Sequence, residues 1–316
     1  MYFNKIIIYF TLNIKKLATI ILFIILCTKF YLNKKVRIAI VAIGKLENHY
    51  IKEWVEHYYN LGVDKIFLYD NNDINGEKFE DEINEYIKKG FVEIIDYRGR
   101  KPNQYNLQSQ SYLDCYQNRV NDFDYMGIFD IDEFLDLGNN VKLYDYISQY
   151  KFKKCQCIKF PWLMMDDNDL ITVENNNYSL KTRFTKGRFL SFCNSIFRTS
   201  FNQINSTKVI FGHGPIGLIS CDPDGNNCFN GSEKGIDPSN MYRKPKITKE
   251  YVRHYSTKTL QEYIEIKMKR LYASRTPEDS KKRINLKTFF KYNKLTDDKL
   301  NYLKKKGLYF NLNYTN

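Results

Sequence analysis

The chain has 316 residues, of which 43% are hydrophobic, and a formal net charge of +13. These values allow one large or two small α/β domains with a sizeable core, and they exclude a mainly disordered chain. Six lysines lie within residues 1–35, where no acidic residue occurs, so the remainder of the chain has a moderate net charge of +7. Because no basic helix with interleaved aromatic residues follows, we expect no nucleic acid partner.

Residues 1–35 are expected to form a cytoplasmic tail and a membrane anchor, a transmembrane helix. The uncharged run from Leu17 to Thr28 reaches Leu32 if Lys29 extends its ammonium group to the membrane interface. A cleaved signal peptide has an apolar region of similar length, but no small-x-small cleavage site follows here. We therefore expect an uncleaved signal anchor and a single-pass type II membrane protein.

Two features after the anchor favour a chain that faces the lumen of the endoplasmic reticulum or Golgi apparatus. Lysines on both sides of the anchor leave its orientation open. N-glycosylation sequons occur at Asn177, Asn205, Asn230 and Asn313. Six of the seven cysteines also follow the anchor, without zinc-site spacing. Cys221 and Cys228 flank a turn-forming segment, so a disulfide between them could close this loop.

Strand-like and helix-like segments alternate from residue 36 onwards. The sequence predicts strands at 36–43, 63–70, 91–97 and 126–129, and helices at 47–61, 77–89 and 104–121. Gly62 and Gly90 follow the first two helices as C-caps. This alternation predicts a mostly parallel, Rossmann-like central sheet that is flanked by helices and joined by right-handed crossovers.

The fourth strand ends in an Asp-x-Asp motif, Asp130-Ile131-Asp132. Carboxylates at the carboxyl end of a buried strand lie where open α/β sheets bind their ligands. Period-2 alternation would place Asp130 and Asp132 on one side, where both could bind one hard divalent cation, Mn²⁺ or Mg²⁺. The alternative is an acidic turn that closes an ordinary strand. Since neither G-x-G-x-x-G nor a Walker loop occurs, a dinucleotide oxidoreductase or a P-loop enzyme is not expected.

The pattern resembles the GT-A type of glycosyltransferase, and more closely glycosyltransferase family 92 and the related family-2-like transferases. The segments that support this are, in chain order, Ile43-Gly-Lys-Leu-Glu-Asn48, Glu53-Trp54 with His57, Gly62-Val-Asp64, Tyr69-Asp-Asn71, Gln110, Phe129-Asp-Ile-Asp-Glu-Phe134, Pro161-Trp162, Asn194-Ser-Ile196 with Arg198, and His254-Tyr255 with Lys258 and Lys267. The resemblance implies a GT-A domain over residues 36–275. It also implies a hexosyltransferase that moves a sugar, galactose in several members, from a uridine-diphosphate (UDP) donor to a glycan, glycoprotein or glycolipid with inversion. The chain departs from the family after Trp162, where residues 163–169 replace the expected Gly/Ser-rich loop.

Candidate metal and donor residues come from several of these segments. Asp130 and Asp132 are expected to bind the metal with a third ligand from the carboxyl-terminal half, for which His254 is preferred and His213 is the alternative. The nucleotide-sugar donor is assigned to Lys45, Glu47, Asp70, Gln110, Asp130 and Lys258. For Lys45, Glu47 and Asp70, the alternative is that they only cap strands.

The acceptor side is assigned to the segments after the Asp-x-Asp motif. An inverting transfer needs one carboxylate to deprotonate the acceptor hydroxyl, and Asp166, Asp167 and Asp169 follow the predicted strand 158–162. The alternative for these three is a solvated loop. Candidate acceptor contacts are Trp162, Arg183 and His213, although Trp162 is equally suited to a core position and Arg183, like Arg198, could instead contact the diphosphate.

Residues 276–316 are expected to form a basic helical extension whose apolar side packs on the domain, with anionic membrane contact as the minor alternative. Two other functions stay open. A catalytically inactive carbohydrate-binding protein with the GT-A fold would not need Asp130 and Asp132, which are both present. A metal-dependent phosphoesterase would need more ligands than the four histidines of the chain supply.

Overall fold

The structure, a computed structural model, describes residues 36–100, 107–138, 141–200, 210–211, 214–215, 217–228, 242, 244–270 and 277–308, with Thr19, Ile21 and Leu22 from the region before them. The chain divides into two compact units, Met1–Val36 and Arg37–Asn316. The predicted anchor lies outside the described residues apart from those three, which are helical. Within the described part, no helix is both long and apolar enough to cross a membrane.

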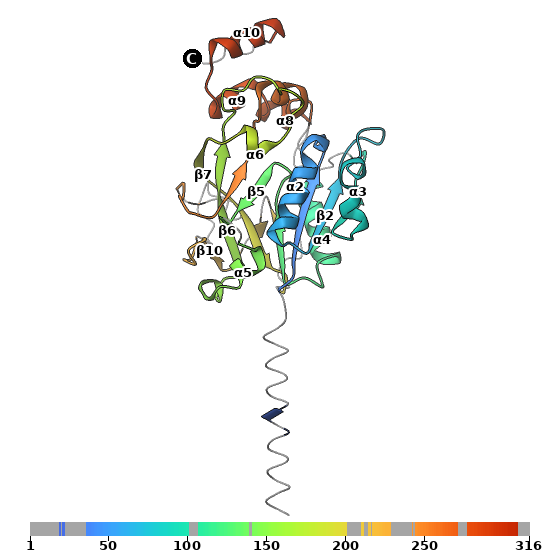
Figure 1. The fold of residues 1–316 in the computed structure, drawn as a ribbon, viewed down its shortest axis with the longest axis vertical. Coiled ribbons are helices and arrows are strands. Elements are labelled where there is room, and N and C mark those ends of the chain that lie inside the picture. Colours follow the sequence, from blue (N-terminus) through green and yellow to red (C-terminus); the bar gives the residue numbers. More distant parts are fainter. Residues whose placement is uncertain are drawn as a thin grey trace, which may run out of the picture. The chain divides into compact units, whose positions relative to one another are not determined.

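The second unit confirms the predicted alternation of strands and helices (Figure 1). The elements of its first half are β1 (Ile38–Gly44), α2 (Asn48–Leu61), β2 (Lys65–Asp70), α3 (Glu80–Lys88), β3 (Val92–Asp96), α4 (Leu107–Asn118) and β4 (Tyr125–Ile128). Gly62 ends α2 with a φ of +88°, a left-handed conformation that glycine adopts without strain. Apolar runs and glycine C-caps therefore located these elements to within a few residues.

The second half adds strands and short helices. These are β5 (Glu133–Asp136), α5 (Leu143–Ile147), η1 (Tyr150–Phe152), β6 (Cys157–Met165), α6 (Leu180–Arg183), β7 (Gly187–Arg198), β8 (Ile210–Phe211), β9 (Gly214–Pro215), β10 (Ser220–Cys221), β11 (Tyr251–His254), α7 (Leu260–Glu262), η2 (Tyr263–Lys267), α8 (Pro277–Arg283), α9 (Leu286–Tyr292) and α10 (Asp297–Lys305). The element η2 is a π-helical turn, a kind of irregularity that is frequent at functional sites.

Nine of the described strands form one mixed sheet, in which β3, β2, β1, β4, β7, β6, β11 and β5 follow one another and β10 pairs with β6. The strands β1 to β4 are parallel to their neighbours among themselves, as predicted. β7 is antiparallel to both β4 and β6, and β5 is antiparallel to β11. The parallel half thus continues into a mixed half that holds β6 and β11.

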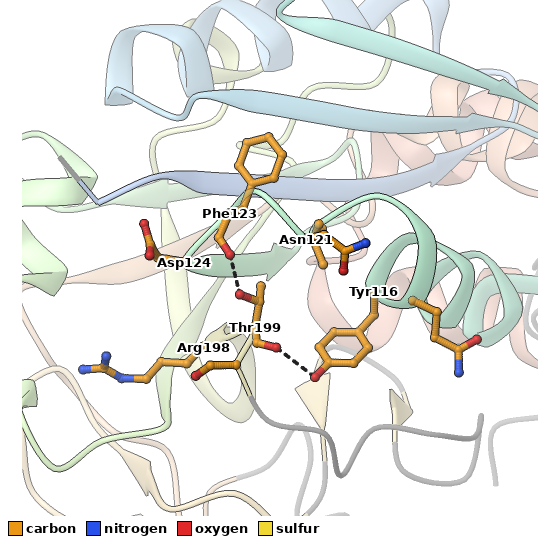
Figure 2. A pocket seen from close by; sticks show the side chains of 9 residues that line it. Tyr116, Asn121, Phe123, Asp124, Arg198 and Thr199 are labelled. Carbon is orange, nitrogen blue, oxygen red and sulfur yellow. Dashed lines mark hydrogen bonds between the residues drawn. The ribbon is translucent and has the colours of Figure 1, made fainter. Parts of the chain in front are cut away.

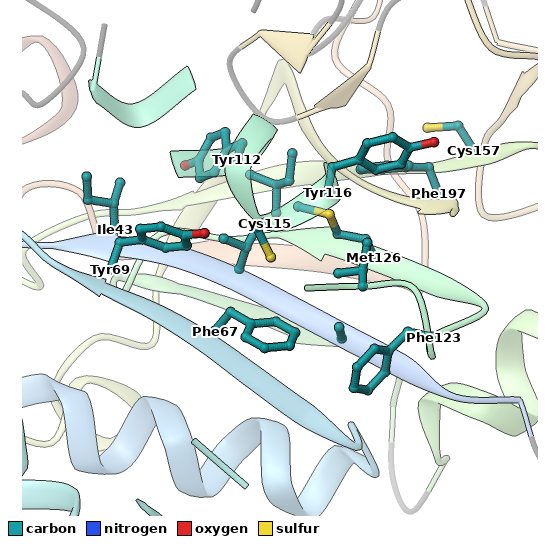
Figure 3. Packing of buried hydrophobic residues seen from close by; sticks show 14 of the residues in the cluster. Ile43, Phe67, Tyr69, Tyr112, Cys115, Tyr116, Phe123, Met126, Cys157 and Phe197 are labelled. Carbon is teal, nitrogen blue, oxygen red and sulfur yellow. The ribbon is translucent and has the colours of Figure 1, made fainter. Parts of the chain in front are cut away.

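Both faces of the parallel half are covered by side chains. Ala39 and Val41 of β1 pack in a buried cluster with Tyr112 and Cys115 of α4, as Figure 3 shows for the two α4 residues. Trp54 of α2 is fully buried as well. Every residue of β1 is buried. Side chains on both faces of this strand are therefore apolar, and its sequence shows no alternation of apolar and polar residues.

The cysteines form a different disulfide from the predicted one. Cys155, which precedes β6, is bonded to Cys221 of β10. Cys228 is a free thiol, so the prediction that it pairs with Cys221 is wrong. The reason is topological: β10 pairs in parallel with β6 and thereby brings Cys221 beside the start of that strand, across 66 residues of sequence.

The C-terminal helices pack on the helix that follows β11. Leu286, Phe289 and Leu303 form a buried cluster with Leu260 and Tyr263. The basic side chains of Lys281, Lys282 and Arg283 in α8 and of Lys304 and Lys305 in α10 are exposed, whereas Lys299 of α10 is buried. An apolar side of these helices thus packs on the domain, and most of their basic side chains face solvent.

Candidate active site

Four strands of the sheet end at one edge. β1 and β4 are parallel neighbours, and β11 is parallel to β6. Since β7 is antiparallel to both β4 and β6, these four strands run in the same direction. The loops that follow them therefore meet at the carboxyl edge of the sheet, where α/β proteins bind their ligands.

The Asp-x-Asp motif lies in a turn at this edge. β4 ends at Ile128, and the N–H of Glu133, the first residue of β5, donates to the Asp130 carbonyl oxygen at 3.0 Å. Strand alternation, from which we predicted that Asp130 and Asp132 lie on one side, therefore does not extend to these residues. The turn is closely packed, because a methyl group added at Gly44 would lie 2.2 Å from the Ile131 Cδ1 atom.

The two aspartates of the motif have different partners. The Gln108 amide and the Tyr112 hydroxyl, both on α4, donate to Asp130 Oδ1 at 3.2 and 3.3 Å. Asp132 is buried, and its Oδ2 lies 3.5 Å from the Lys258 ammonium and 3.7 Å from that of Lys267. Asp130 is thus the more accessible carboxylate, and Asp132 is the one that lies among cations.

His254, the last residue of β11, completes the surroundings of Asp132. Its Nε2 lies 3.5 Å from Asp132 Oδ1, and its Nδ1 lies 3.7 Å from Glu133 Oε1. Burial alone would raise the pKa of the Asp132 carboxyl, but the charges of Lys258, Lys267 and His254 hold that pKa well below its usual range. Asp132 is therefore ionised at neutral pH.

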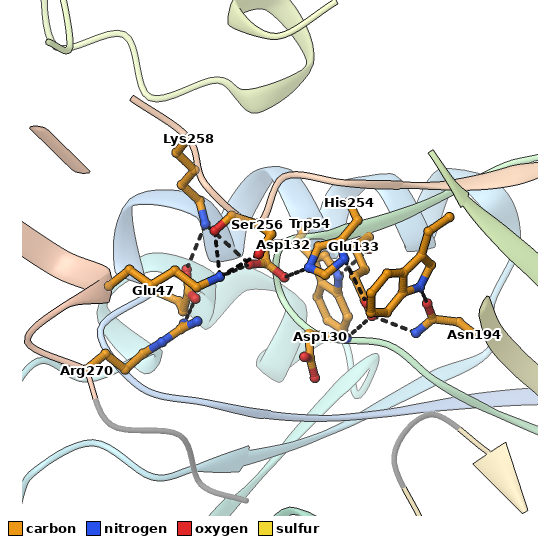
Figure 4. Close-up of polar contacts among 12 residues, drawn as sticks. Glu47, Trp54, Asp130, Asp132, Glu133, Asn194, His254, Ser256, Lys258 and Arg270 are labelled. Carbon is orange, nitrogen blue, oxygen red and sulfur yellow. Dashed lines mark hydrogen bonds and ion pairs between the residues drawn. The ribbon is translucent and has the colours of Figure 1, made fainter. Parts of the chain in front are cut away.

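A second buried carboxylate, Glu47, faces the same cations from the loop after β1 (Figure 4). It forms an ion pair with Arg270, and its Oε2 lies 3.9 Å from the Lys258 ammonium. Burial lowers the pKa of Lys258, and Asp132 opposes this effect. Lys258, Lys267 and Arg270 thus place three cationic side chains against the two carboxylates of Glu47 and Asp132.

Glu133 holds the motif turn in place through hydrogen bonds of its side chain and its backbone. Its Oε2 accepts hydrogen bonds from the Asp130 N–H at 2.8 Å and from the Asn194 amide at 2.6 Å. The Trp54 indole of α2 donates to the Glu133 carbonyl oxygen at 3.0 Å. Burial, together with the charges of Asp130 and Asp132, raises the pKa of the Glu133 carboxyl well above its usual range. Glu133 therefore braces the motif turn through its side chain and its backbone.

The donor set near Asp132 suits a hard or borderline divalent cation. Asp132 and His254 face each other, and the His254 Nδ1 atom is buried without a hydrogen-bond partner, so this ring nitrogen is not held by another group. Within the ranges that the structure describes, no group of three or more His, Cys, Asp or Glu residues is close enough to hold a metal alone. A metal here would therefore use Asp132 and His254, with Asp130 and ligand oxygens as further donors.

Three predicted donor residues lie elsewhere on the edge. Asp70 ends β2, is fully buried and accepts a hydrogen bond from the Arg98 guanidinium at 2.8 Å. Lys45 follows β1 and forms an exposed ion pair with Asp73 at 2.7 Å. Gln110 is half-buried on α4, the helix that also carries Gln108 and Tyr112, the hydrogen-bond partners of Asp130. Of the predicted donor set, Glu47, Lys258 and Asp130 lie closest to the carboxylate and cation cluster.

The three candidate bases share one loop after β6. Asp167 is buried, and its Oδ2 lies 2.7 Å from the Lys299 ammonium of α10. Asp169 Oδ1 lies 3.3 Å from the same ammonium group, although the Asp169 side chain is 59% exposed. Asp166 is half-buried and accepts a hydrogen bond from the Asn168 N–H at 2.9 Å. Asp166 and Asp169 are therefore more accessible than Asp167.

The predicted acceptor contacts have different surroundings. The Trp162 ring meets the His254 ring edge-on at a centroid distance of 4.3 Å, and its indole N–H donates to the Asn194 side chain. Trp162 is thus next to the site and 8% exposed. Arg183 forms a buried bidentate ion pair with Glu262. His213, the alternative metal ligand, lies outside the described residues.

Four contributors were not among the predicted site residues: Lys267, Arg270, Gln108 and Glu133. Lys267 had a signal, since it belonged to the segments of the family resemblance, and Glu133 follows Asp132 directly. Arg270 and Gln108 belong to no short motif. Arg270 reaches the site because η2 and the turn after it place its side chain beside Glu47, more than 200 residues away in sequence.

One cavity, whose lining residues Figure 2 shows, lies at the other end of the sheet. It has a volume of about 520 Å³ and is lined by residues around Tyr116, Asp124 and Arg198. Asp124 precedes β4 and Arg198 ends the antiparallel β7, so this cavity is at the amino end of β4. It therefore does not contain the Asp-x-Asp motif.

Comparison with known proteins gives a family match. The family model described as glycosyltransferase family 92 matches residues 40–293, most of the chain. This range includes the Asp-x-Asp turn, β11 and the residues of the cation cluster. No curated protein matches the chain significantly.

Several solved structures resemble parts of the chain. S. aureus TarS shares 12% identity over 52% of this chain and 29% of that chain (TM-score 0.30), and TarS 1-349 in complex with UDP shares 12% over 55% and 51% (TM-score 0.31). The mannosyltransferase PcManGT from Pyrobaculum calidifontis in complex with GDP-Man and Mn²⁺ shares 8% over 64% and 59% (TM-score 0.32). The chain thus spans 29–59% of these proteins, and at these TM-scores the likeness supports no inference about the site.

Proposed function

Because the chain belongs to glycosyltransferase family 92, we propose that it is a metal-dependent, inverting glycosyltransferase that uses a UDP-sugar donor. The acceptor hydroxyl of a glycan or glycoconjugate attacks the anomeric carbon, the bond to the diphosphate breaks, and UDP leaves. The acceptor proton passes to a carboxylate of the protein. UDP-galactose is the first donor to test, because the family resemblance implies galactose transfer in several members.

The observation that supports this proposal most directly is the buried cluster at the carboxyl edge. Lys258, Lys267 and Arg270 lie against the carboxylates of Glu47 and Asp132. A diphosphate carries the charge that such a cluster of cations would bind, and the leaving diphosphate gains negative charge as the sugar bond breaks. Stabilisation of that charge in a buried site is the largest contribution that a transferase of this kind can make to its rate.

Lys258 has a backbone feature that fits this role. Its φ is +56°, a left-handed conformation that costs a residue with a side chain about 1 kcal/mol. Strained residues of this kind cluster at ligand-binding sites. In this conformation the Lys258 ammonium lies 3.9 Å from Glu47 Oε2 and 3.5 Å from Asp132 Oδ2.

The residues present fit a divalent metal, which would supply Lewis-acid stabilisation of the leaving diphosphate. Asp132 and His254 would hold it, with Asp130 as a further oxygen donor. Glu133 keeps the Asp130 backbone and the motif turn in place. Asn194 links Glu133 to Trp162, so the metal side and the proposed acceptor side share one hydrogen-bond network.

The acceptor lies, in this proposal, between Trp162 and the loop that holds Asp166 and Asp169. Trp162 offers an aromatic edge next to His254 for a sugar ring. Asp166 or Asp169 takes the proton, since both are more accessible than Asp167, which is buried against Lys299. An acceptor hydroxyl must lie within hydrogen-bond reach of that carboxylate when the donor is bound.

The test is donor hydrolysis and transfer by the full chain with a panel of nucleotide sugars, with Mn²⁺ or with a chelator. We expect one UDP-sugar to be hydrolysed with metal only, and Asp132→Asn to lower the rate at least about 100-fold, as the loss of a charge-stabilising contact does. Asp224→Asn is the matched control, because Asp224 is 59% exposed and pairs with Lys246 at 3.2 Å. Full hydrolysis by Asp132→Asn would refute the metal role. Glycan binding without any hydrolysis would instead support the carbohydrate-binding alternative.

A further inference from the structure

We propose that Lys299 on the C-terminal helix α10 is a positioning residue for the acceptor. In this proposal it fixes the loop 166–171 against the domain, so that the accessible carboxylates of the loop, those of Asp166 and Asp169, face the acceptor. The inference rests on the proposed transferase function and deepens it, because it assigns acceptor affinity to a part of the chain beyond residue 293, where the family match ends.

The loop lies directly beside the metal side of the site. β6 and β11 are parallel neighbours, and Met164 pairs with His254. Asp166 follows one residue after Met165, at the same edge, and its N–H donates to the Lys186 carbonyl oxygen at 3.0 Å. Any movement of the loop therefore changes the space next to His254 and Trp162.

The backbone of the loop needs support from outside. Asn168 and Asp169 have φ values of +50° and +61°, two consecutive left-handed residues. Asn and Asp adopt this conformation more readily than most residues, but each still costs some free energy. Such conformations persist when the surrounding structure determines them.

Lys299 and Asn293 supply that support. The Lys299 side chain is fully buried, and its ammonium group lies 2.7 Å from Asp167 Oδ2 and 3.3 Å from Asp169 Oδ1 and donates to the Lys294 carbonyl oxygen at 2.8 Å. The Asn293 side-chain oxygen accepts a hydrogen bond from the Asp167 N–H at 2.8 Å. Both the side chain and the backbone of Asp167 are thus held by the C-terminal segment.

Hydrogen bonds link Asp167, which Lys299 contacts, to the rest of the loop. Asp167 Oδ1 accepts the Asp169 N–H at 3.0 Å, and the Asp167 carbonyl oxygen accepts the Leu170 N–H at 2.8 Å. One residue further on, the Ile171 carbonyl oxygen accepts the Gln261 N–H at 2.8 Å. Asp167 is therefore the internal anchor of the loop, and Lys299 is the group that keeps this anchor in place.

A purely structural ion pair and a positioning role predict different results for a double variant. Lys299→Met leaves the buried Asp167 charge unpaired, so this single variant loses stability in either case. The double variant Lys299→Met with Asp167→Asn removes both charges and should recover much of the melting temperature. If the pair positions the acceptor loop, the acceptor KM stays raised in the double variant although the melting temperature recovers.

The experiment measures the full chain with Mn²⁺ and the UDP-sugar that it hydrolyses. The acceptor probe is the member of a panel of p-nitrophenyl glycosides that the unmodified protein glycosylates fastest. We expect the acceptor KM to rise about tenfold or more in both Lys299 variants, since displacement of a positioned group by about 1 Å can cost 100-fold. The donor KM should change less than about twofold. Lys306→Met, which removes an exposed lysine of the same C-terminal segment from its pair with Glu265, is the control.

Hydrogen exchange gives a second measurement that does not depend on the acceptor. In the Lys299→Met protein, amides of peptide 166–171 should exchange faster, and those of β1 should be unchanged. Recovery of both the melting temperature and the acceptor KM in the double variant would overturn the proposal. So would a loss of kcat with unchanged acceptor KM, which would assign Asp167 to the chemistry, or unchanged exchange of peptide 166–171. Absence of donor hydrolysis by the unmodified protein would refute the proposed function instead, while the exchange of this peptide would still report whether Lys299 fixes the loop.

Discussion

Arg183 was predicted from the sequence to contact the acceptor or the diphosphate, and its surroundings predict a large stability effect. Its guanidinium donates to Glu262 through two hydrogen bonds of 2.7 and 2.8 Å, and the two side chains are only 7% and 2% exposed. The Tyr50 hydroxyl donates to the same carboxylate at 2.8 Å, and Glu262 closes a capping box with Thr259. Removal of Arg183 therefore leaves a buried carboxylate that accepts hydrogen bonds from neutral groups, those of Tyr50 and Thr259.

We expect Arg183→Met to lower the free energy of unfolding by about 3–5 kcal/mol, the usual loss when one partner of a buried pair is removed. For a domain of this size, this corresponds to a fall in melting temperature of about 6–20 °C. The assay is thermal unfolding at neutral pH, followed by circular dichroism. Arg183→Lys keeps the charge but not the bidentate geometry, so its melting temperature should lie between those of the unmodified protein and Arg183→Met.

The pH dependence of the same effect provides a second test. Burial alone would raise the pKa of Glu262, but the hydrogen bonds and charge of Arg183 hold it below its usual range. A carboxyl whose pKa is lower in the folded state contributes its full stabilisation above its unfolded pKa, about 4.3, and loses it as the pH falls through the folded value. The melting-temperature difference between the unmodified protein and Arg183→Met should therefore shrink below about pH 4. A variant that melts within about 2 °C of the unmodified protein at pH 7, with raised acceptor KM, would refute this reasoning and favour a direct acceptor contact.

Two other predictions concern the disulfide and the packing of the motif turn. Cys155→Ser or Cys221→Ser should each cost about 4 kcal/mol, because the bond closes a loop of 66 residues, whereas Cys228→Ser should cost less than about 1 kcal/mol. Peptide mapping without reduction should find Cys155 linked to Cys221, and a Cys221–Cys228 peptide would contradict the structure. Gly44→Ala should lower the free energy of unfolding by about 1–3 kcal/mol, because its methyl group would lie 2.2 Å from Ile131 Cδ1 and force the motif turn to move. Unchanged chemical denaturation of Gly44→Ala would mean that the Ile131 side chain turns away freely.

The parallel half of the fold could be predicted from the sequence because its signals are local. Each strand is a short apolar run, and each of the first two helices ends at a glycine that stops it. The mixed half lacks such signals. β7 pairs with β4 and β6 across long separations, and its outer part, from Gly187 to Ser191, is exposed or half-buried and shows no clear apolar pattern. Its position in the sheet depends on those partners, which a local pattern does not identify.

The Asp-x-Asp motif was found from local sequence, but its environment was not. Asp132 has its present partners because β11 ends at His254 beside β5 and because the segment after it turns back with Lys258 and Lys267. These contacts join residues more than 120 positions apart, and no spacing rule connects them. The sequence therefore predicts the carboxylates of such a site better than the cations that surround them.

In the proposed function, the cation cluster also accounts for the stability of a site for a highly charged donor before the donor binds. Burial of the Lys258 and Lys267 charges without partners would strongly destabilise the folded protein. Their pairs with Asp132 and Glu47 offset that cost. A bound diphosphate would offer the same lysines a stronger anion, and a divalent cation would offer Asp132 a stronger partner. In the proposed function, metal and donor would therefore bind cooperatively, because the metal would free the lysines from Asp132 and the diphosphate would free Asp132 from the lysines.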